Sequence, residues 1–504
     1  MRPMLTTWLG LLSLGTGAAL AYAQPEDWIS LDRCAGCHQQ GEKWNKKPNP
    51  KLDPLNKKKT TDFVLMNEYE TWSQHDPHRN AAQALTNALG RRMGQLLQIK
   101  PEQHTACLSC HAVDTQPTKP FADKTADDYY SAEGNNCLSC HGKSRQWFEP
   151  HSLVSWRTKT PQEKSEKGLV DLRDAVVRAE LCASCHVGNA SEGKIVTHEM
   201  YAAGHPPLMP LEVISFCDHE PRHWRWPDEV PYFKADELTK EQLRDIYHYY
   251  PGTNDRTRQM VLSALTSFRV TMQMLQAEAQ NGPLDLAHFD CYACHHDLKR
   301  PSWRQQRGYP GRPAGRPIIR PVSYELVRAV LAGTGGDIAT LDAKMAALNR
   351  AYTTRAFGTP KEIAASAAEL IAWTNEVVAN LRQRPFDPQQ SLAVARELTA
   401  GFRSAPKQPG VPLFDYDTSW QLTSALSVVL GDPFLKRGEL ATPAWQALDA
   451  RLRLSLLPPK GQAYNYDQQL RARLVLRNDF DPRSLSEYFE ALGRSLDAVD
   501  PPRP

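Results

Sequence analysis

Ten of the eleven cysteines in this 504-residue chain form five Cys-x-x-Cys pairs, and a histidine directly follows each pair. Two thiols at this spacing can form thioethers with the two vinyl groups of one porphyrin, and the adjacent histidine then faces the iron. The pattern therefore predicts five covalently bound haem c groups. The attachment sites are Cys34, Cys37, Cys107, Cys110, Cys137, Cys140, Cys182, Cys185, Cys291 and Cys294, and the proximal iron ligands are His38, His111, His141, His186 and His295.

Disulfides, zinc knuckles and thioredoxin-like redox pairs are the other common uses of paired cysteines. None of the three needs a histidine directly after the second cysteine. Histidine makes up 16 of 504 residues, so its presence at all five positions by chance has a probability of about 3 in 10⁸. The eleventh cysteine, Cys217, has no partner thiol. We expect it to be a buried free cysteine, with a crosslink or a role beside a haem as alternatives.

The remaining histidines are concentrated in the same part of the chain and are candidates for the second ligand of each iron. They are His75, His78, His104, His151, His198, His205, His219, His223, His248, His288 and His296. Ligation of each iron by two imidazoles is the leading expectation, with Met209 as a less favoured thioether ligand. A helix over residues 197–204 would separate His198 and His205 by about 10.5 Å along its axis, which suits two neighbouring haems.

Several stretches between these motifs resemble the hydroxylamine-oxidoreductase-like multihaem cytochromes, which include the cytochrome c-554 type. The stretches are Trp72 to His78, Cys137 to His151, Cys182 to Gly188, Thr197 to Leu208 and Phe289 to Tyr309, so the likeness covers about residues 64–310. In that family remote histidines supply distal ligands to stacked haem pairs. The resemblance implies that His78, His151 and His205 are distal ligands, with His198 and His223 as further candidates.

Members of that family range from electron carriers to enzymes, and two functions follow as hypotheses. The first is electron transfer between redox donor and acceptor proteins through closely packed haems. The alternative is a redox enzyme acting on nitrite or hydroxylamine at one haem with an open distal face, with His219, His248 and Tyr249 as acid–base candidates. Every motif ends in histidine, so the Cys-x-x-Cys-Lys site of related nitrite reductases is missing. Electron transfer is therefore the preferred hypothesis.

The chain begins with the pattern of an export signal. Arg2 precedes a largely apolar run from Leu5 to Leu20, and Ala21-Tyr22-Ala23 matches the small-x-small cleavage pattern. We expect a signal peptide over residues 1–23, a periplasmic mature protein, and no integral membrane span in it. An uncleaved N-terminal anchor is the alternative. The formal charge of +3 gives no indication of nucleic-acid binding.

The elements that must position these groups are predicted to be mainly α-helical, with no convincing series of strands. We expect an irregular, loop-rich multihaem region over residues 24–322, followed by a helical bundle over residues 323–504. In this second part Thr359-Pro360-Lys361-Glu362 predicts a capped helix start before an apolar face. Asp387-Pro388 and Asp481-Pro482 predict two more starts. The bundle should dock on the haem region or pair two copies of the chain.

Overall fold

The computed structural model describes residues 28–29, 31–39, 65–157, 159–224, 239–241, 255–295, 316, 319–320, 322–384, 386–404, 414–432, 443–454 and 466–499. Helices dominate these residues, so the prediction of a mainly α fold is confirmed. The β-structure named among them is one two-stranded antiparallel ribbon of β1 (Val113–Asp114) and β2 (Tyr129–Tyr130), with Val113 opposite Tyr130.

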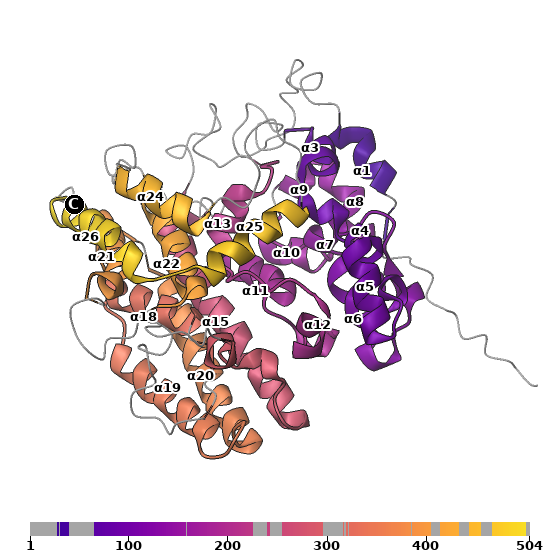
Figure 1. The fold of residues 1–504 in the computed structure, drawn as a ribbon. Helices are drawn as coiled ribbons and strands as arrows, with labels where there is room; N and C mark the ends of the chain where they lie inside the picture. The colour runs from indigo at the N-terminus through magenta and orange to yellow at the C-terminus, as the bar shows by residue number, and fades with distance from the viewer. Residues whose placement is uncertain are drawn as a thin grey trace, which may run out of the picture.

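The first part of the chain, indigo to magenta in Figure 1, is built from short helices joined by irregular segments. Its helices are α1 (Leu31–His38), α3 (Glu68–His75), α4 (Gln83–Thr86), α5 (Ala88–Leu97), α6 (Thr105–His111), α7 (Cys137–His141), α8 (Arg145–Phe148), α9 (Val154–Arg157), α10 (Pro161–Ser165), α11 (Ala175–His186), α12 (His198–Ala203) and α13 (Val213–His219). Single 3₁₀ turns lie at Pro77–Asn80, Pro101–Gln103, Phe121–Asp123, Ala126–Asp128, Pro150–Ser152 and Ala190–Glu192. This region is loop-rich, as predicted.

The second part consists of longer helices that pack side by side. They are α15 (Asp255–Asn281), α18 (Val322–Thr334), α19 (Ile338–Thr353), α20 (Pro360–Arg382), α21 (Pro388–Ser404), α22 (Tyr416–Val429), α24 (Pro443–Leu452), α25 (Tyr466–Asn478) and α26 (Arg483–Asp497). A 3₁₀ turn at Leu286–His288 and the short α16 (Cys291–Cys294) follow α15. Because α15 precedes residue 323 and packs on α18, α20 and α22, the boundary at residues 322/323 stays a prediction.

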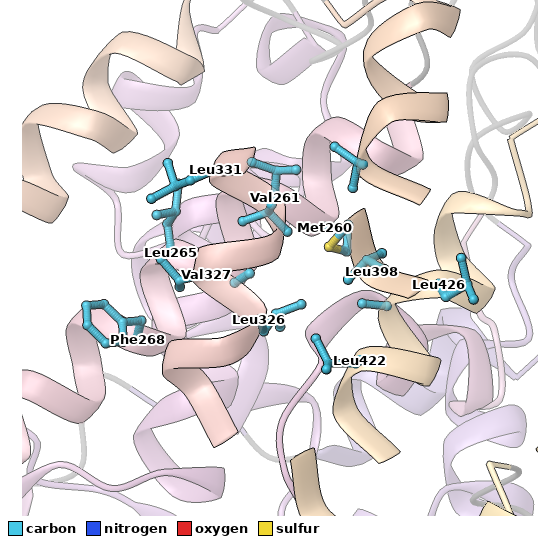
Figure 2. Packing of buried hydrophobic residues seen from close by; sticks show 14 of the residues in the cluster. Met260, Val261, Leu265, Phe268, Leu326, Val327, Leu331, Leu398, Leu422 and Leu426 are labelled. Atoms are coloured by element: carbon cyan, nitrogen blue, oxygen red, sulfur yellow. The ribbon is translucent and has the colours of Figure 1, made fainter. Parts of the chain in front are cut away.

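The main hydrophobic core surrounds α15. Met260, Leu265 and Phe268 on this helix are almost fully buried. Figure 2 shows them with Leu326 and Val327 of α18 and with Leu398, Leu422 and Leu426 from the other helices of this layer. The α15 helix buries polar as well as apolar side chains, among them Thr257, Ser263 and Thr266. The α15 helix also contacts α11 and α13, so it packs against both parts of the chain.

Two of the three helix starts predicted in the second part form as expected, and one differs. Asp387 Oδ1 accepts the Gln390 N–H at 2.8 Å while Gln390 Oε1 accepts the Asp387 N–H at 3.1 Å, a complete capping box. Asp481 Oδ1 accepts the Arg483 N–H ahead of α26. The α20 helix begins at Pro360, but its N-cap Thr359 makes no side-chain cap and its buried hydroxyl has no partner. The prediction of a capping box at Thr359 is therefore wrong.

Polar and aromatic contacts join the helical layer to the haem-motif region. Gln421 of α22 donates from Nε2 to the Leu211 carbonyl at 2.7 Å. Next to it Trp420, which is fully buried, meets Phe216 edge to face with ring centroids 5.9 Å apart. Phe216 in turn meets the motif histidine His186 edge to face at 5.3 Å. The second layer therefore forms part of the wall behind one of the five motifs.

Candidate haem-binding sites

Each Cys-x-x-Cys-His motif occupies the end of a helix. α1, α6, α7 and α11 all terminate on the motif histidine, and α16 terminates one residue before His295. In one helical turn the two cysteines, three positions apart, lie on the same face. Local capping supports this geometry: Asn136 accepts the Leu138 N–H ahead of α7, and Asp174 accepts two N–H groups ahead of α11. The same local structure thus presents two thiols and a histidine at all five motifs.

Four of the five motif histidines face a second histidine. His38 lies 6.3 Å from His151, His78 lies 6.2 Å from His186, His111 lies 6.5 Å from His205, and His198 lies 6.3 Å from His295, all measured between ring centroids. The angles between the ring planes are 15°, 89°, 83° and 33° in the same order. Each pair combines a motif histidine with a histidine from a distant segment.

The remaining motif histidine, His141 of the third motif, is partly buried and lies near His223. Burial lowers its pKa most, and the charges of His223, His38 and His151 act in the same direction, so the pKa falls to about 4. His141 is therefore close to His223 and also to the His38–His151 pair. Four of the sequence-predicted distal candidates, His78, His151, His198 and His205, therefore each pair with a different motif histidine, and the fifth, His223, lies in the neighbourhood of His141.

The spacing of these pairs can be tested against the size of an imidazole–iron–imidazole unit. A metal–imidazole bond of about 2.0 Å, plus about 1.1 Å from the nitrogen to the ring centre, gives about 6.2 Å between two rings on opposite sides of one metal ion. The four measured distances of 6.2–6.5 Å agree with this value. The residues present therefore fit a haem iron between the two rings of each pair.

Burial keeps several of these imidazoles neutral, which is the form that binds a metal. It lowers the pKa of His186 to about 4, and the nearby His78 adds to this effect. It also lowers the pKa of His205 to about 4, although the Pro206 carbonyl opposes the shift. His78 differs: burial opposes its charged form, but the carboxylates of Asp76 and Glu220 outweigh burial and raise its pKa to about 9.

The motifs adjoin one another in space in an order that differs from their order in the chain. After burial, the charge of Cys34 contributes to raising the pKa of Cys137 to about 12, which places the first motif beside the third. Cys140 of the third motif acts in the same way on Cys182 of the fourth. The thiols of Cys185 and Cys110 are hydrogen-bonded to each other, so the fourth motif adjoins the second.

The second and fifth motifs are joined by one short helix. Thr197 caps α12 by accepting the Met200 N–H at 3.2 Å, and Gly204 ends the helix with φ +118°. His198 at its start faces His295, whereas His205 just beyond its end faces His111. One segment therefore places a histidine opposite each of two motif histidines. The spatial order of the motifs is first, third, fourth, second, fifth.

Other histidines among the described residues have different surroundings. His75 is exposed, His288 Nε2 lies 2.8 Å from Glu278 Oε1, and His219 Nδ1 bonds to the Ser215 carbonyl of its own helix at 2.5 Å. His104, at the start of α6, is part-buried and its Nδ1 has no hydrogen-bond partner. Met209 packs against the main core. His248, Tyr249, His296 and the predicted signal peptide lie outside the described residues.

Cys217 is a free thiol on α13 and packs with Cys182 and Phe216 against a small cluster that includes Ala179 and Leu211. Burial raises the pKa of its thiol, so it stays neutral. It borders a cavity of about 220 Å³, which Arg178, Asp218 and Arg256 also line. These surroundings suit a small, largely apolar residue beside the fourth motif.

The residues that orient the paired histidines were not among the candidates predicted from the sequence. Glu68 Oε2 lies 2.8 Å from His38 Nδ1, and Asp76 Oδ1 lies 2.9 Å from His78 Nδ1. Asp76 stands two residues before His78, a spacing that could have drawn attention to it. Glu68 is 30 residues from His38, and its partner could not be found without the fold.

One protein-family model matches part of the region that carries these motifs. Residues 66–142 and 136–204 match the family model described as cytochrome c554 and c-prime. No curated protein and no solved structure matches the chain. The match covers the second, third and fourth motifs and the distal candidates His78, His151 and His198. It supports covalently bound haem c and electron transfer as the chemistry of this region.

Among the described residues, histidine, cysteine and carboxylate side chains form no group of three or more that could hold a bare metal ion. The histidines meet in pairs instead. In the same part of the chain, no helix combines the length and apolar character that crossing a bilayer requires.

Proposed function

We propose that the protein is a periplasmic pentahaem c-type cytochrome that carries electrons between redox proteins. The match of residues 66–204 to the cytochrome c554 and c-prime family model supports this proposal. The observation that carries the proposal is the set of four histidine pairs at 6.2–6.5 Å, one at each of four motifs. His223, beside His141, completes the set. In this proposal every iron has two imidazole ligands.

The proposed ligand assignment follows directly from the pairs. The first haem is attached to Cys34 and Cys37, the second to Cys107 and Cys110, the third to Cys137 and Cys140, the fourth to Cys182 and Cys185, and the fifth to Cys291 and Cys294. The axial pairs, in the same order, are His38 with His151, His111 with His205, His141 with His223, His186 with His78, and His295 with His198.

Haem c, when bound, supplies a one-electron ferric/ferrous couple whose potential depends on the axial ligands and their surroundings. The chain's own contribution is to hold five such sites close together. The attachment positions Cys110 and Cys185 lie side by side, which brings the second and fourth sites close together. Trp420 and Phe216 close the wall behind His186 with apolar rings, which keeps the local dielectric low.

The contacts between motifs support a relay rather than five independent centres. The order first, third, fourth, second, fifth runs without interruption from α1 to α16. A line of this kind has two ends, the first and the fifth motif, where donor and acceptor proteins can bind. Export to the periplasm, inferred from residues 1–23, agrees with the compartment in which this thioether chemistry is completed.

An enzymatic role would require a motif histidine with no imidazole on the other side of its iron. The four measured pairs and the closeness of His223 to His141 leave no such motif among the five in our assignment. The sixth coordination position would then be filled at every iron, and nitrite or hydroxylamine would have no site to bind.

The test is the spin state of the purified ferric protein. We expect an entirely low-spin spectrum at neutral pH and no spectral change when carbon monoxide is added to the reduced protein or nitrite to the oxidised protein. A high-spin signal from about one haem in five would instead identify an open iron and favour the enzyme. The variant His205→Ala is a positive control, since it should create such a signal at the second haem.

A further inference from the structure

The paired histidines differ in what their second ring nitrogen contacts. When Nε2 of an imidazole binds a metal, Nδ1 carries the proton and donates a hydrogen bond. For His111 and His205 the acceptor is a backbone carbonyl, that of Ala81 at 2.7 Å and that of Pro206 at 2.8 Å. For His151 it is the Phe148 carbonyl. A carbonyl is a neutral dipole and withdraws little of the proton's charge.

At the first motif the acceptor is a carboxylate held in place from two sides. Glu68 Oε2 accepts from His38 Nδ1 at 2.8 Å. The other oxygen, Oε1, accepts the backbone N–H groups of Leu65 at 2.7 Å and Met66 at 3.1 Å. The Glu68 side chain is only 16% exposed. With both oxygens engaged, this carboxylate cannot rotate away from His38 without losing several hydrogen bonds.

At the fourth motif a second carboxylate, that of Asp76, accepts a hydrogen bond from Nδ1 of the paired histidine His78. Asp76 caps the turn Pro77–Asn80 by accepting the His78 N–H at 2.9 Å, and the same oxygen lies 2.9 Å from His78 Nδ1. The Asp76 side chain is 11% exposed. Glu220 Oε1 lies 3.9 Å from the same Nδ1, too far for a hydrogen bond but close enough to add negative charge.

A negative acceptor strengthens the hydrogen bond from Nδ1 and leaves more electron density on Nε2. A more basic imidazole is a stronger donor to iron and favours the ferric over the ferrous state. Poor exposure to solvent makes the effect larger, because water screens these charges little. Carboxylate-bonded and carbonyl-bonded haems in one chain should therefore differ in midpoint potential.

We propose that Glu68 and Asp76 are positioning residues that lower the midpoint potentials of the first and fourth haems relative to the second. The inference rests on the proposed axial pairs and deepens the proposed function, since it assigns different potentials to named sites. The second haem is the reference, because both of its histidines bond to backbone carbonyls. In the spatial order of the motifs, the two low-potential sites are separated by the third haem.

The test is a redox titration at one fixed pH, followed by electron paramagnetic resonance of the holoprotein. The variants Glu68→Gln and Asp76→Asn keep an acceptor oxygen of similar shape and remove the charge, and asparagine also retains the cap before Pro77. We expect Glu68→Gln to raise the potential of the first haem more than that of any other, and Asp76→Asn to do the same for the fourth. Smaller rises are expected at the third haem, because both carboxylates also lie near its motif. Glu220→Gln should raise the fourth by a smaller amount, because its oxygen is not hydrogen-bonded to His78.

The matched control is Glu70→Gln, which removes one charge from an exposed position on the same helix as Glu68 and should shift no haem measurably. If Glu68→Gln and Asp76→Asn shift potentials no more than Glu70→Gln while wild-type protein retains five low-spin haems, this inference is wrong and the proposed function stands. If wild-type protein lacks five haems or shows an open iron, the proposed function itself fails.

Discussion

The angle between the paired imidazole planes leads to a prediction for the ferric protein. Parallel planes split the two iron orbitals that interact with the imidazoles and give a rhombic low-spin signal. Perpendicular planes leave these orbitals nearly equal in energy and give a strongly anisotropic signal with a larger maximum g value. The His38–His151 rings are 15° from parallel, whereas His78–His186 and His111–His205 are 89° and 83° apart.

The perturbation that uses this contrast is His151→Ala. It removes one ring from the nearly parallel pair and leaves the first iron with His38 as its only protein ligand. With five motifs in the chain, about one fifth of the total haem should change from low to high spin. The intensity should come from the rhombic part of the spectrum, and the strongly anisotropic signals should keep their intensity.

The assay is quantitative electron paramagnetic resonance of the oxidised protein, with His205→Ala as the matched variant. That second change should also convert one fifth of the haem, but at the expense of a strongly anisotropic signal, because its pair is nearly perpendicular. Loss of the same signal in both variants, or no high-spin iron in either, would refute the assignment of these histidines to different irons.

Three further outcomes are expected. Trp420→Ala should lower the free energy of unfolding by about 3–5 kcal/mol in urea titrations, since Trp420 is fully buried against Phe216. The control is Val475→Ala: this side chain is 58% exposed, so its removal should change the free energy of unfolding by less than about 0.5 kcal/mol. Burial raises the pKa of Glu325 to about 7 against the opposing charge of Arg328, so its ionisation destabilises the folded state as pH rises from about 4.5 through 7. Between pH 4 and pH 8 the stability of Glu325→Gln relative to wild type should therefore rise by up to about 3 kcal/mol, and a difference that does not change with pH would contradict this. Cys217→Ala should leave the haem content at five per chain by absorbance, whereas Cys182→Ala should not.

The motif chemistry can be predicted from the sequence alone because haem attachment is encoded locally, and the family match supports covalent haem at the second, third and fourth motifs. One helical turn carries both thiols and the histidine, so no tertiary information is needed to find Cys137, Cys140 and His141. Prediction of the distal histidines needed more than a local sequence pattern. His205 and His151 were proposed by family resemblance, and it is the fold that brings His205 opposite His111 and His151 opposite His38. Their role as ligands stays a prediction until haem binding is measured.

Features that depend on contacts between distant residues were harder to predict from the sequence. The capping pattern at Asp387 forms, but the same pattern at Thr359 does not, because the Thr359 N–H bonds to the Ala351 carbonyl and the hydroxyl is left buried without a partner. Glu68 meets His38 across 30 residues of chain, so no periodicity could reveal it. The spatial order of the motifs likewise depends on packing, as the Cys110–Cys185 contact shows.

The most direct test of the whole account is the number of haems per chain. Mature protein from a host that assembles c-type cytochromes should be assayed by pyridine haemochrome absorbance together with its intact mass. We predict five haem c groups on each chain, which remain attached when the protein is denatured. A colourless protein, or one whose mass lacks the five added cofactors, would contradict the claim that the paired cysteines and histidines form haem sites.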